Sequence, residues 1–357
     1  MAKRIGILTA GGDCPGLNAT IRGVAKAMYQ KMDNVEMVGI VDGYKGLIEG
    51  EAHEMKQSDF SGILTRGGTI LGTARTPYSM MRVKENDVDK VALMKANYKK
   101  LKLDCLLTLG GNGTHKTANL LAQEGLHVIG LPKTIDNDIW GTDVTFGFHT
   151  AVDIGTEVVD RIHTTASSHK RVMVVEIMGN KAGWLTLYTG IAGGADIILI
   201  PEIPYNIKKV IKAVERRADR GSGFSVITVA EGAYSAAEAK LKKKERAEKR
   251  AKEGYTTATN RIAQEINAMT GFDTRVVVPG HFLRGGTPSS YDRVLASQFG
   301  VYAAELVSKG VFGVAVAEQN DKVTHNLLAD VAGKTKFVPA DNQMVATARS
   351  LGISFGD

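Results

Sequence analysis

Runs of aliphatic and β-branched residues recur along the chain, separated by amphipathic stretches of helix length. The runs are continuously apolar, which is typical of strands buried on both faces, and their alternation with helices predicts parallel sheets between helical layers. The sequence therefore predicts an α/β fold with largely parallel sheets. The predicted strands are 5–10, 35–40, 105–110, 127–132, 171–179, 197–202, 224–232, 275–280 and 312–318.

Glycine-rich and polar segments follow four of these predicted strands. They are GGDCPGLN (11–18), GNGT (111–114), KTIDND (133–138) and NKAG (180–183). Parallel sheets bind their ligands at the carboxyl ends of the strands. We therefore expect the four segments to converge at this edge.

The composition is that of an ordinary globular protein. With 357 residues, 43% hydrophobic and 23% charged, the chain can bury a large core and divide into two lobes. No apolar stretch approaches the roughly 18 residues of a membrane span, and the N-terminus lacks the apolar core of a signal peptide. Cys14 and Cys105 suit reduced thiols. We expect a cytoplasmic protein without a membrane partner.

The net charge of +7 is concentrated in one segment, KLKKKERAEKRAKE (240–253). Acidic residues are interleaved there and no aromatic residue offers a stacking platform, so no nucleic acid partner is expected. We interpret residues 236–253 as a charged helical insertion exposed to solvent. Binding of an anionic partner is the alternative.

Two glycine loops are candidates for phosphate binding. The loop 11–16 ends a predicted strand and opens a helix, so its backbone N–H groups and the helix dipole can face an anion. The loop 110–113 repeats this arrangement before a helix expected to begin near Thr114. Two such loops at one sheet edge can hold a polyphosphate, although each alone is also compatible with a structural turn.

The segment GLPKTIDND adds two carboxylates at the same edge. If it is extended, Asp136 and Asp138 point the same way, as a general base and a metal or water partner would. Phosphoryl transfer to a hydroxyl uses such a base together with positive groups around the phosphate. The alternative is an acidic turn in which Asp136 caps a helix.

Seven motifs together resemble the bacterial phosphofructokinases, in order and at similar spacing, between residue 3 and about residue 316. They are TAGGDCPGLNATIRG, GGTILGTART, LGGNGT, GLPKTIDND, SSHKRVMVVEIMG, IAGGAD and GHFLRGGTPSSYDR. The resemblance implies two similar Rossmann-like three-layer lobes with the active site in the cleft between them, in a homotetramer or homodimer. The implied phosphoryl-donor lobe is 1–147 with 283–335, and the implied fructose 6-phosphate lobe is 148–282 with 336–357.

The implied activity is 6-phosphofructokinase, which phosphorylates fructose 6-phosphate to fructose 1,6-bisphosphate with ATP and Mg²⁺ in glycolysis. By the motifs, Asp136 accepts the proton of the sugar hydroxyl, and Thr134 and Gly12 lie against the transferring phosphate. Arg75 bridges the donor phosphates, a role suited to a planar, permanently charged fork; a surface ion pair is its alternative.

The resemblance assigns further binding residues. Arg171 and Arg275 reach the 6-phosphate from a neighbouring subunit, His281 and Arg284 do so from within, and Glu231 binds sugar hydroxyls. Tyr44 borders the donor pocket or is simply packed. The donor side is completed by Thr76, Gly111, Asn112, Gly113, Thr114 and Lys133, and the sugar side by Ile135, Met178, Gly179 and Asn180.

The chain departs from the family pattern at three places. Asn112 replaces the aspartate that serves magnesium in typical ATP-using members, so Asn112 and Asp138 are the expected metal ligands. Gly113 is typical of ATP-using phosphofructokinases, and Lys133 is typical of pyrophosphate-using ones. A mixed group of the family has both residues together. We favour ATP as the phosphoryl donor, with pyrophosphate as the alternative. At the effector site, His163 and Ser222 stand where regulated bacterial members have basic residues, so we expect fewer cations and weak or no control by ADP or phosphoenolpyruvate.

Three other functions compete with this one. A non-catalytic regulatory homologue would have no reason to keep Asp136, Thr134 and Arg75. A glycine-loop kinase acting on NAD or a lipid would not need the cluster HFLRGG with Arg171 and Arg275. A Rossmann dehydrogenase requires a GxGxxG spacing that GGDCPG does not have.

Overall fold

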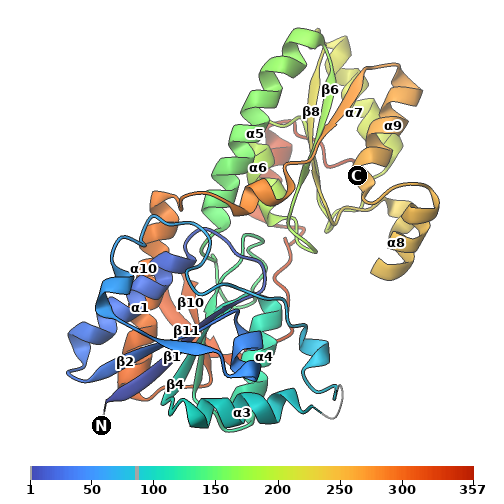
Figure 1. Cartoon of the computed structure of the whole chain (residues 1–357). Helices are drawn as coiled ribbons and strands as arrows, with labels where there is room; N and C mark the ends of the chain where they lie inside the picture. Colours follow the sequence, from blue (N-terminus) through green and yellow to red (C-terminus); the bar gives the residue numbers. More distant parts are fainter. Residues whose placement is uncertain (1, 85–87) are drawn as a thin grey trace. The chain divides into compact units, whose positions relative to one another are not determined.

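The computed structural model describes residues 2–84 and 88–357, which form two compact units (Figure 1). The first unit lies within Met1–Thr150 and Arg284–Lys336, and the second comprises Ala151–Leu283 and Phe337–Asp357. Each contains a mainly parallel sheet with helices on both faces, which confirms the predicted fold class. The active-site cleft and the assignment of donor and sugar to separate lobes stay predictions.

The sheet of the first unit has the strand order β11-β10-β5-β4-β1-β2-β3. Neighbouring strands are parallel except at the two edges, where β3 and β11 run antiparallel to β2 and β10. The strands are β1 (Lys3–Ala10), β2 (Val35–Ile40), β3 (Ala52–Met55), β4 (Cys105–Gly110), β5 (Val128–Pro132), β10 (Val314–Gln319) and β11 (Lys322–Leu327).

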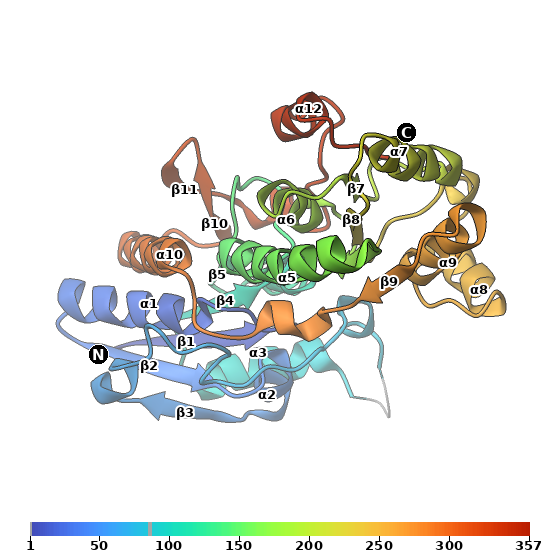
Figure 2. The ribbon, with the colours of Figure 1, turned by 90° about the horizontal axis from the view of Figure 1, so that it is seen from above.

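Helices cover both faces of this sheet (Figures 1 and 2). On one face, α1 and α10 pack closely because Gly300 has no side chain: a Cβ there would lie 2.6 Å from the nitrogen of Val24. The opposite face carries α2 and α3. The helices are α1 (Leu17–Lys31), α2 (Tyr44–Glu49), α3 (Lys90–Lys100), α4 (Asn112–Gln123), α10 (Ser290–Lys309) and α11 (Leu328–Val331), with 3-10 turns η1 (Gln57–Phe60) and η2 (Tyr78–Met80).

The second unit is built around four parallel strands in the order β7-β8-β6-β9. Helices α5 and α6 cover one face and α7 and α9 the other (Figure 2). The strands are β6 (Val172–Ile177), β7 (Ile197–Leu199), β8 (Ser225–Ala230) and β9 (Thr274–Val277). The helices are α5 (Phe148–His169), α6 (Trp184–Ala192), α7 (Ile207–Asp219), α8 (Lys243–Lys252), α9 (Ala258–Thr270) and α12 (Gln343–Ser350), with η3 (Ala236–Glu238) and η4 (Gly280–Arg284).

The strand order places three of the four predicted ligand segments side by side. In the first unit β4 lies between β1 and β5, so the segments 11–18, 111–114 and 133–138 leave the same edge of one sheet. The fourth segment, 180–183, follows β6 and belongs to the second unit, so the expectation of one shared edge holds for three segments only.

None of the described helices has the length and apolarity that a membrane span requires.

Candidate active site

Helix α4 presents an uncapped N-terminus at the end of β4. It begins at Asn112 rather than near Thr114, and its N-cap, Gly111, makes no side-chain capping hydrogen bond. The first backbone N–H groups of a helix without such a cap are available to an anion. A Cβ built on Gly113 would meet no described atom within 4 Å, so packing does not require a glycine at this position.

The first glycine loop makes a close contact with an arginine from far along the chain. A Cβ on Gly12 would lie 2.7 Å from Nη1 of Arg284, and this nitrogen donates to the carbonyl oxygen of Asp13 at 3.1 Å. Gly16, with φ of 104°, is the N-cap of α1. The side-chain amide of Asn18 donates to the carbonyl oxygen of Arg66 at 3.0 Å. Glycine at position 12 therefore lets a guanidinium approach the loop backbone.

Lys133 places an ammonium group beside the same loop. Its side chain is buried, and Nζ donates to the carbonyl oxygen of Gly12. Burial lowers the pKa of Lys133 because the charged form loses hydration. The backbone nitrogen of Lys133 donates to Gly110 at 3.0 Å, which ties the lysine to the second glycine loop. A phosphate between the loops would supply the counter-charge that this ammonium needs.

The segment that carries the two aspartates is bent and not extended. Asn137 lies between them with φ of 50°, in the left-handed region, so Asp136 and Asp138 do not follow strand alternation. No described helix begins at Asp136, which is not a cap. The hydroxyl of Thr134 accepts a hydrogen bond from the backbone nitrogen of Asp136 at 3.1 Å, and this holds the threonine beside the carboxylate.

Two residues that the sequence analysis missed fix this bent segment. Thr145 donates from its hydroxyl to the carbonyl of Thr134 at 2.7 Å and from its backbone nitrogen to Oδ1 of Asn137 at 3.1 Å. Lys336 donates from Nζ to the same Oδ1 at 3.1 Å and to the carbonyl of Asp143 at 2.8 Å. Lys336 lies 199 positions from Asn137, so no local pattern could have indicated the contact.

Asn112 and Asp138 provide oxygen atoms that suit a hard divalent cation. Nδ2 of Asn112 donates to Oδ2 of Asp138 at 3.0 Å, while Oδ1 of Asn112 is buried without a hydrogen-bond partner among the described residues. Burial raises the pKa of Asp138, and the hydrogen bond from Asn112 opposes that shift. A buried amide oxygen lacking a donor, next to a carboxylate, fits the ligand preference of Mg²⁺.

The loop that carries Arg75 and Thr76 lies beside the first glycine loop. Thr73 donates from its hydroxyl to the carbonyl of Gly11 at 2.6 Å. Arg75 is exposed and forms no ion pair with any residue the structure describes, so the alternative surface ion pair is not observed.

Tyr44 is buried and donates to the carbonyl of Thr114 at 2.9 Å, which makes it a packed residue beneath α4.

In the second unit, the loops after β6 and β8 meet. The carboxylate of Glu231 accepts a hydrogen bond from the backbone nitrogen of Asn180 at 2.6 Å. Gly179 has φ of 148°, and a Cβ there would lie 2.6 Å from the carbonyl of Ala182. Met178 begins this turn, so the structure brings together all four predicted sugar-side residues of the two loops.

A single carboxylate joins two of the arginines expected to bind the 6-phosphate. Asp273 contacts Nε of Arg171 at 2.6 Å and Nη1 of Arg275 at 2.5 Å. All three residues lie at the adjacent strands β6 and β9. Asp273 was not predicted as a site residue, because no sequence pattern indicates that one carboxylate pairs with both arginines. His281 is exposed in η4 of the second unit, whereas Ile135 is buried in the first.

Ser222 lines a separate cavity of about 370 Å³. Arg216, Arg217 and Arg220 line the same cavity, so cations lie near Ser222, while weak control by ADP or phosphoenolpyruvate stays a prediction. His163 packs against an aromatic ring in the same unit.

The similarity of the whole chain to known proteins decides its family. A family profile described as phosphofructokinase matches residues 4–307. The chain belongs to the phosphofructokinase family. An ATP-dependent 6-phosphofructokinase of Spirochaeta thermophila is 55% identical over 99% of this chain and 98% of the relative. The ATP-dependent 6-phosphofructokinase 3 of Bacteroides thetaiotaomicron is 46% identical over 99% of this chain and 100% of the relative.

Solved phosphofructokinase structures share the fold. The enzyme of Pichia pastoris in the T-state aligns with a TM-score of 0.79 and 31% identity, over 99% of this chain but only 37% of the longer yeast chain. The pyrophosphate-dependent phosphofructokinase of Nitrosospira multiformis aligns with a TM-score of 0.82 at 19% identity, which shows the fold alone.

Proposed function

We propose that this phosphofructokinase transfers the γ-phosphoryl group of ATP to the 1-hydroxyl of fructose 6-phosphate, with Mg²⁺, as a cytoplasmic enzyme of glycolysis. The observation that carries the proposal is the gathering of an uncapped helix N-terminus, the Lys133 ammonium and the Thr134–Asp138 segment at one edge of the first sheet. Such an edge combines anion-binding backbone with a candidate base, as phosphoryl transfer to a hydroxyl requires.

The open space at Gly113 supports ATP as the donor. Since a side chain there would meet no described protein atom within 4 Å, the space suits the inner phosphate of a nucleotide. The relatives at 55% and 46% identity are both named ATP-dependent enzymes. Lys133 can bind a phosphate of either donor, which makes pyrophosphate-dependent transfer the second candidate.

In the proposed reaction the new bond joins the sugar 1-oxygen to phosphorus as the bond to the donor's bridging oxygen breaks. Asp136 accepts the hydroxyl proton, Thr134 lies against the transferring phosphate, and Arg75 with the backbone of Gly12 balances its charge. Mg²⁺, which Asn112 and Asp138 would hold together with the donor phosphates, neutralises charge on the phosphates when bound.

On the acceptor side, Glu231 and the Met178–Asn180 turn bind the sugar hydroxyls. His281 and Arg284 bind the 6-phosphate from within the subunit, and Arg171 and Arg275 bind that of a neighbouring subunit. This division requires a homo-oligomer, for which we propose a homotetramer or a homodimer.

Formation of fructose 1,6-bisphosphate from fructose 6-phosphate and Mg²⁺ tests the proposal, with ATP and pyrophosphate supplied in parallel at equal concentration. Turnover with ATP is the expected result. Turnover with pyrophosphate alone would show that Lys133 outweighs the open space at Gly113. Absence of turnover with both donors would favour a non-catalytic homologue.

A further inference from the structure

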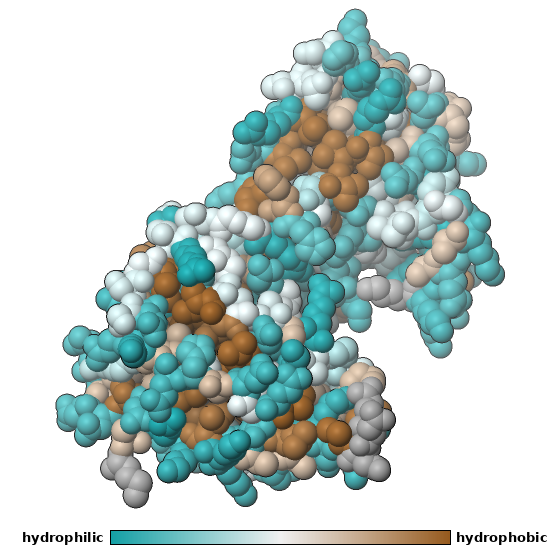
Figure 3. All heavy atoms as spheres, viewed as in Figure 1, coloured by the Kyte–Doolittle hydropathy of each residue, from teal (hydrophilic) through white to brown (hydrophobic). Residues whose placement is uncertain are grey.

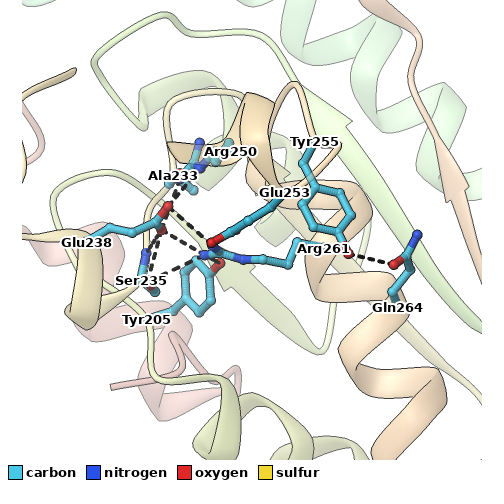
Figure 4. Close-up of polar contacts among 9 residues, drawn as sticks. All are labelled: Tyr205, Ala233, Ser235, Glu238, Arg250, Glu253, Tyr255, Arg261 and Gln264. Carbon is cyan, nitrogen blue, oxygen red and sulfur yellow. Dashed lines mark hydrogen bonds and ion pairs between the residues drawn. The ribbon is translucent and has the colours of Figure 1, made fainter. Parts of the chain in front are cut away.

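The charged insertion is held by a buried cluster of ion pairs and is not simply a solvated helix (Figure 4). Glu238 is 1% exposed and accepts hydrogen bonds from Nε of Arg250 at 2.9 Å and from Nη2 of Arg261 at 2.8 Å. Arg250 also donates to the carbonyl of Ala233 at 2.9 Å. Because Arg250 lies on α8, this cluster fixes the position of the helix, although much of its surface is hydrophilic (Figure 3).

Fixing Arg250 also determines where Arg246 lies. Residues four apart occupy the same face of a helix, so Arg246 lies one turn before Arg250 on the face of α8 turned toward the body of the unit. Its guanidinium is 3.9 Å from the centre of the Tyr234 ring. Stacking on an aromatic face leaves the N–H edge of a guanidinium available to a second partner.

Arg246 and Glu231 line the same cavity, which has a volume of about 420 Å³. One wall comes from α8 and the other from the loops after β6 and β8, where Asn180 and Glu231 lie. The cavity is therefore at the carboxyl edge of the second sheet, the edge at which parallel sheets bind ligands.

Arg246 has no ion-pair partner in the part of the chain that the structure describes, which is 2–84 and 88–357. Arg250 on the same face, by contrast, is fully engaged with Glu238. A stacked, half-buried arginine without a carboxylate partner, facing a cavity of ligand size, is suited to bind an anionic small molecule.

We propose that Arg246 contacts the phosphorylated hexose bound at Glu231, so that the insertion forms one wall of the acceptor site. The inference rests on the proposed function and deepens it. Glu231 accepts hydrogen bonds from the sugar hydroxyls, and Arg246 donates hydrogen bonds to oxygen atoms of the anionic sugar phosphate. Arg246 then contributes to selection of a phosphorylated over an unphosphorylated hexose.

Arg246→Gln tests this inference because it removes the charge and keeps a polar side chain. A hydrogen bond to a charged group contributes enough that the KM for fructose 6-phosphate should rise about 10- to 100-fold. The KM for ATP and the unfolding temperature should stay unchanged. Lys252→Gln is the matched control, since it removes one exposed charge from the same helix and should leave all three quantities at the wild-type values.

Calorimetric titration of the full-length protein shows whether Arg246 binds the sugar phosphate or inorganic phosphate. Fructose 6-phosphate should bind more weakly to Arg246→Gln than to the wild type, and Arg246→Lys should be intermediate. An unchanged affinity for fructose 6-phosphate would overturn the inference. If the affinity for inorganic phosphate fell while that for fructose 6-phosphate did not, Arg246 would belong to a separate anion site. If the wild type neither binds nor phosphorylates fructose 6-phosphate, the proposed function itself fails.

Discussion

The side-chain nitrogen of Asn112 lies 3.0 Å from a carboxylate oxygen of Asp138, and the amide donates a hydrogen bond to that oxygen. A neutral amide can form this contact without a cation. An aspartate in its place would put two carboxylates side by side, an arrangement that needs a proton or a metal ion to be stable.

Asn112→Asp should therefore strengthen the binding of Mg²⁺ and destabilise the metal-free protein. We expect the Mg²⁺ concentration for half-maximal activity to fall, and the unfolding temperature without metal to decrease by several degrees, recovering when Mg²⁺ is added. Activity titrations with Mg²⁺ and thermal unfolding with and without the ion measure both effects. An unchanged response to Mg²⁺ would place position 112 away from the metal.

Asp136→Asn should reduce turnover while substrate binding survives. Loss of a general base lowers kcat by about 10² to 10⁴, and the amide has nearly the same shape as the carboxylate. Initial rates and calorimetric binding of fructose 6-phosphate distinguish the two effects, with the exposed Asp330→Asn as control. Near-normal kcat in Asp136→Asn would rule out Asp136 as the base.

Asp273→Asn should increase the affinity for fructose 6-phosphate. The carboxylate of Asp273 contacts both Arg171 and Arg275, so it would compete with the 6-phosphate that these two guanidinium groups are proposed to bind. The pairs are partly exposed, and pairs of this kind contribute up to about 1 kcal/mol each, so the KM should fall about threefold to tenfold. The effect should shrink at high salt. A higher KM would instead mean that Asp273 orients the arginines.

Glu238 should make the protein sensitive to acid. Burial raises the pKa of Glu238, but hydrogen bonds from Arg250, Ser235 and Arg261 outweigh it and lower the pKa to about 2. Because the pKa is below the ordinary value near 4.5, the contribution of Glu238 to stability is present above pH 4.5 and is lost as the pH falls toward 2.

Glu238→Gln should reduce the free energy of unfolding at pH 7 by about 3 to 5 kcal/mol, since it leaves buried arginines without their carboxylate. Urea unfolding at pH 7, 5 and 3 measures the loss. The variant should also show a smaller decline of stability between pH 4.5 and 3 than the wild type. An identical decline in both proteins would assign the acid sensitivity to other carboxylates.

Strong local patterns predicted the buried elements and the glycine loops. All nine predicted strands are present, and all except β9 are apolar runs buried over most of their length. The edge strands β3 and β11 escaped prediction, since most of their side chains are only partly buried or exposed and form no apolar run. The bend at Asn137 also escaped, because a left-handed asparagine leaves no periodic signal.

The contacts that the sequence could not indicate join residues far apart in the chain. The Arg284 contact with Gly12 joins residues far apart in the first unit's sequence. Arg250 is buried although its neighbours on α8 are charged. Burial of Arg250 depends on Glu238, whose position depends on the turn of η3. Pairings of this kind follow from tertiary structure, and a single sequence does not encode them locally.

The position of Lys336 has a consequence for biosynthesis. The ammonium that braces Asn137 is added to the growing chain 199 residues after Asn137 itself. A nascent chain that has already formed β1, β4 and β5 therefore still lacks one support of its candidate base while it is on the ribosome. The bent segment is therefore fully braced only after Lys336 has been added to the chain.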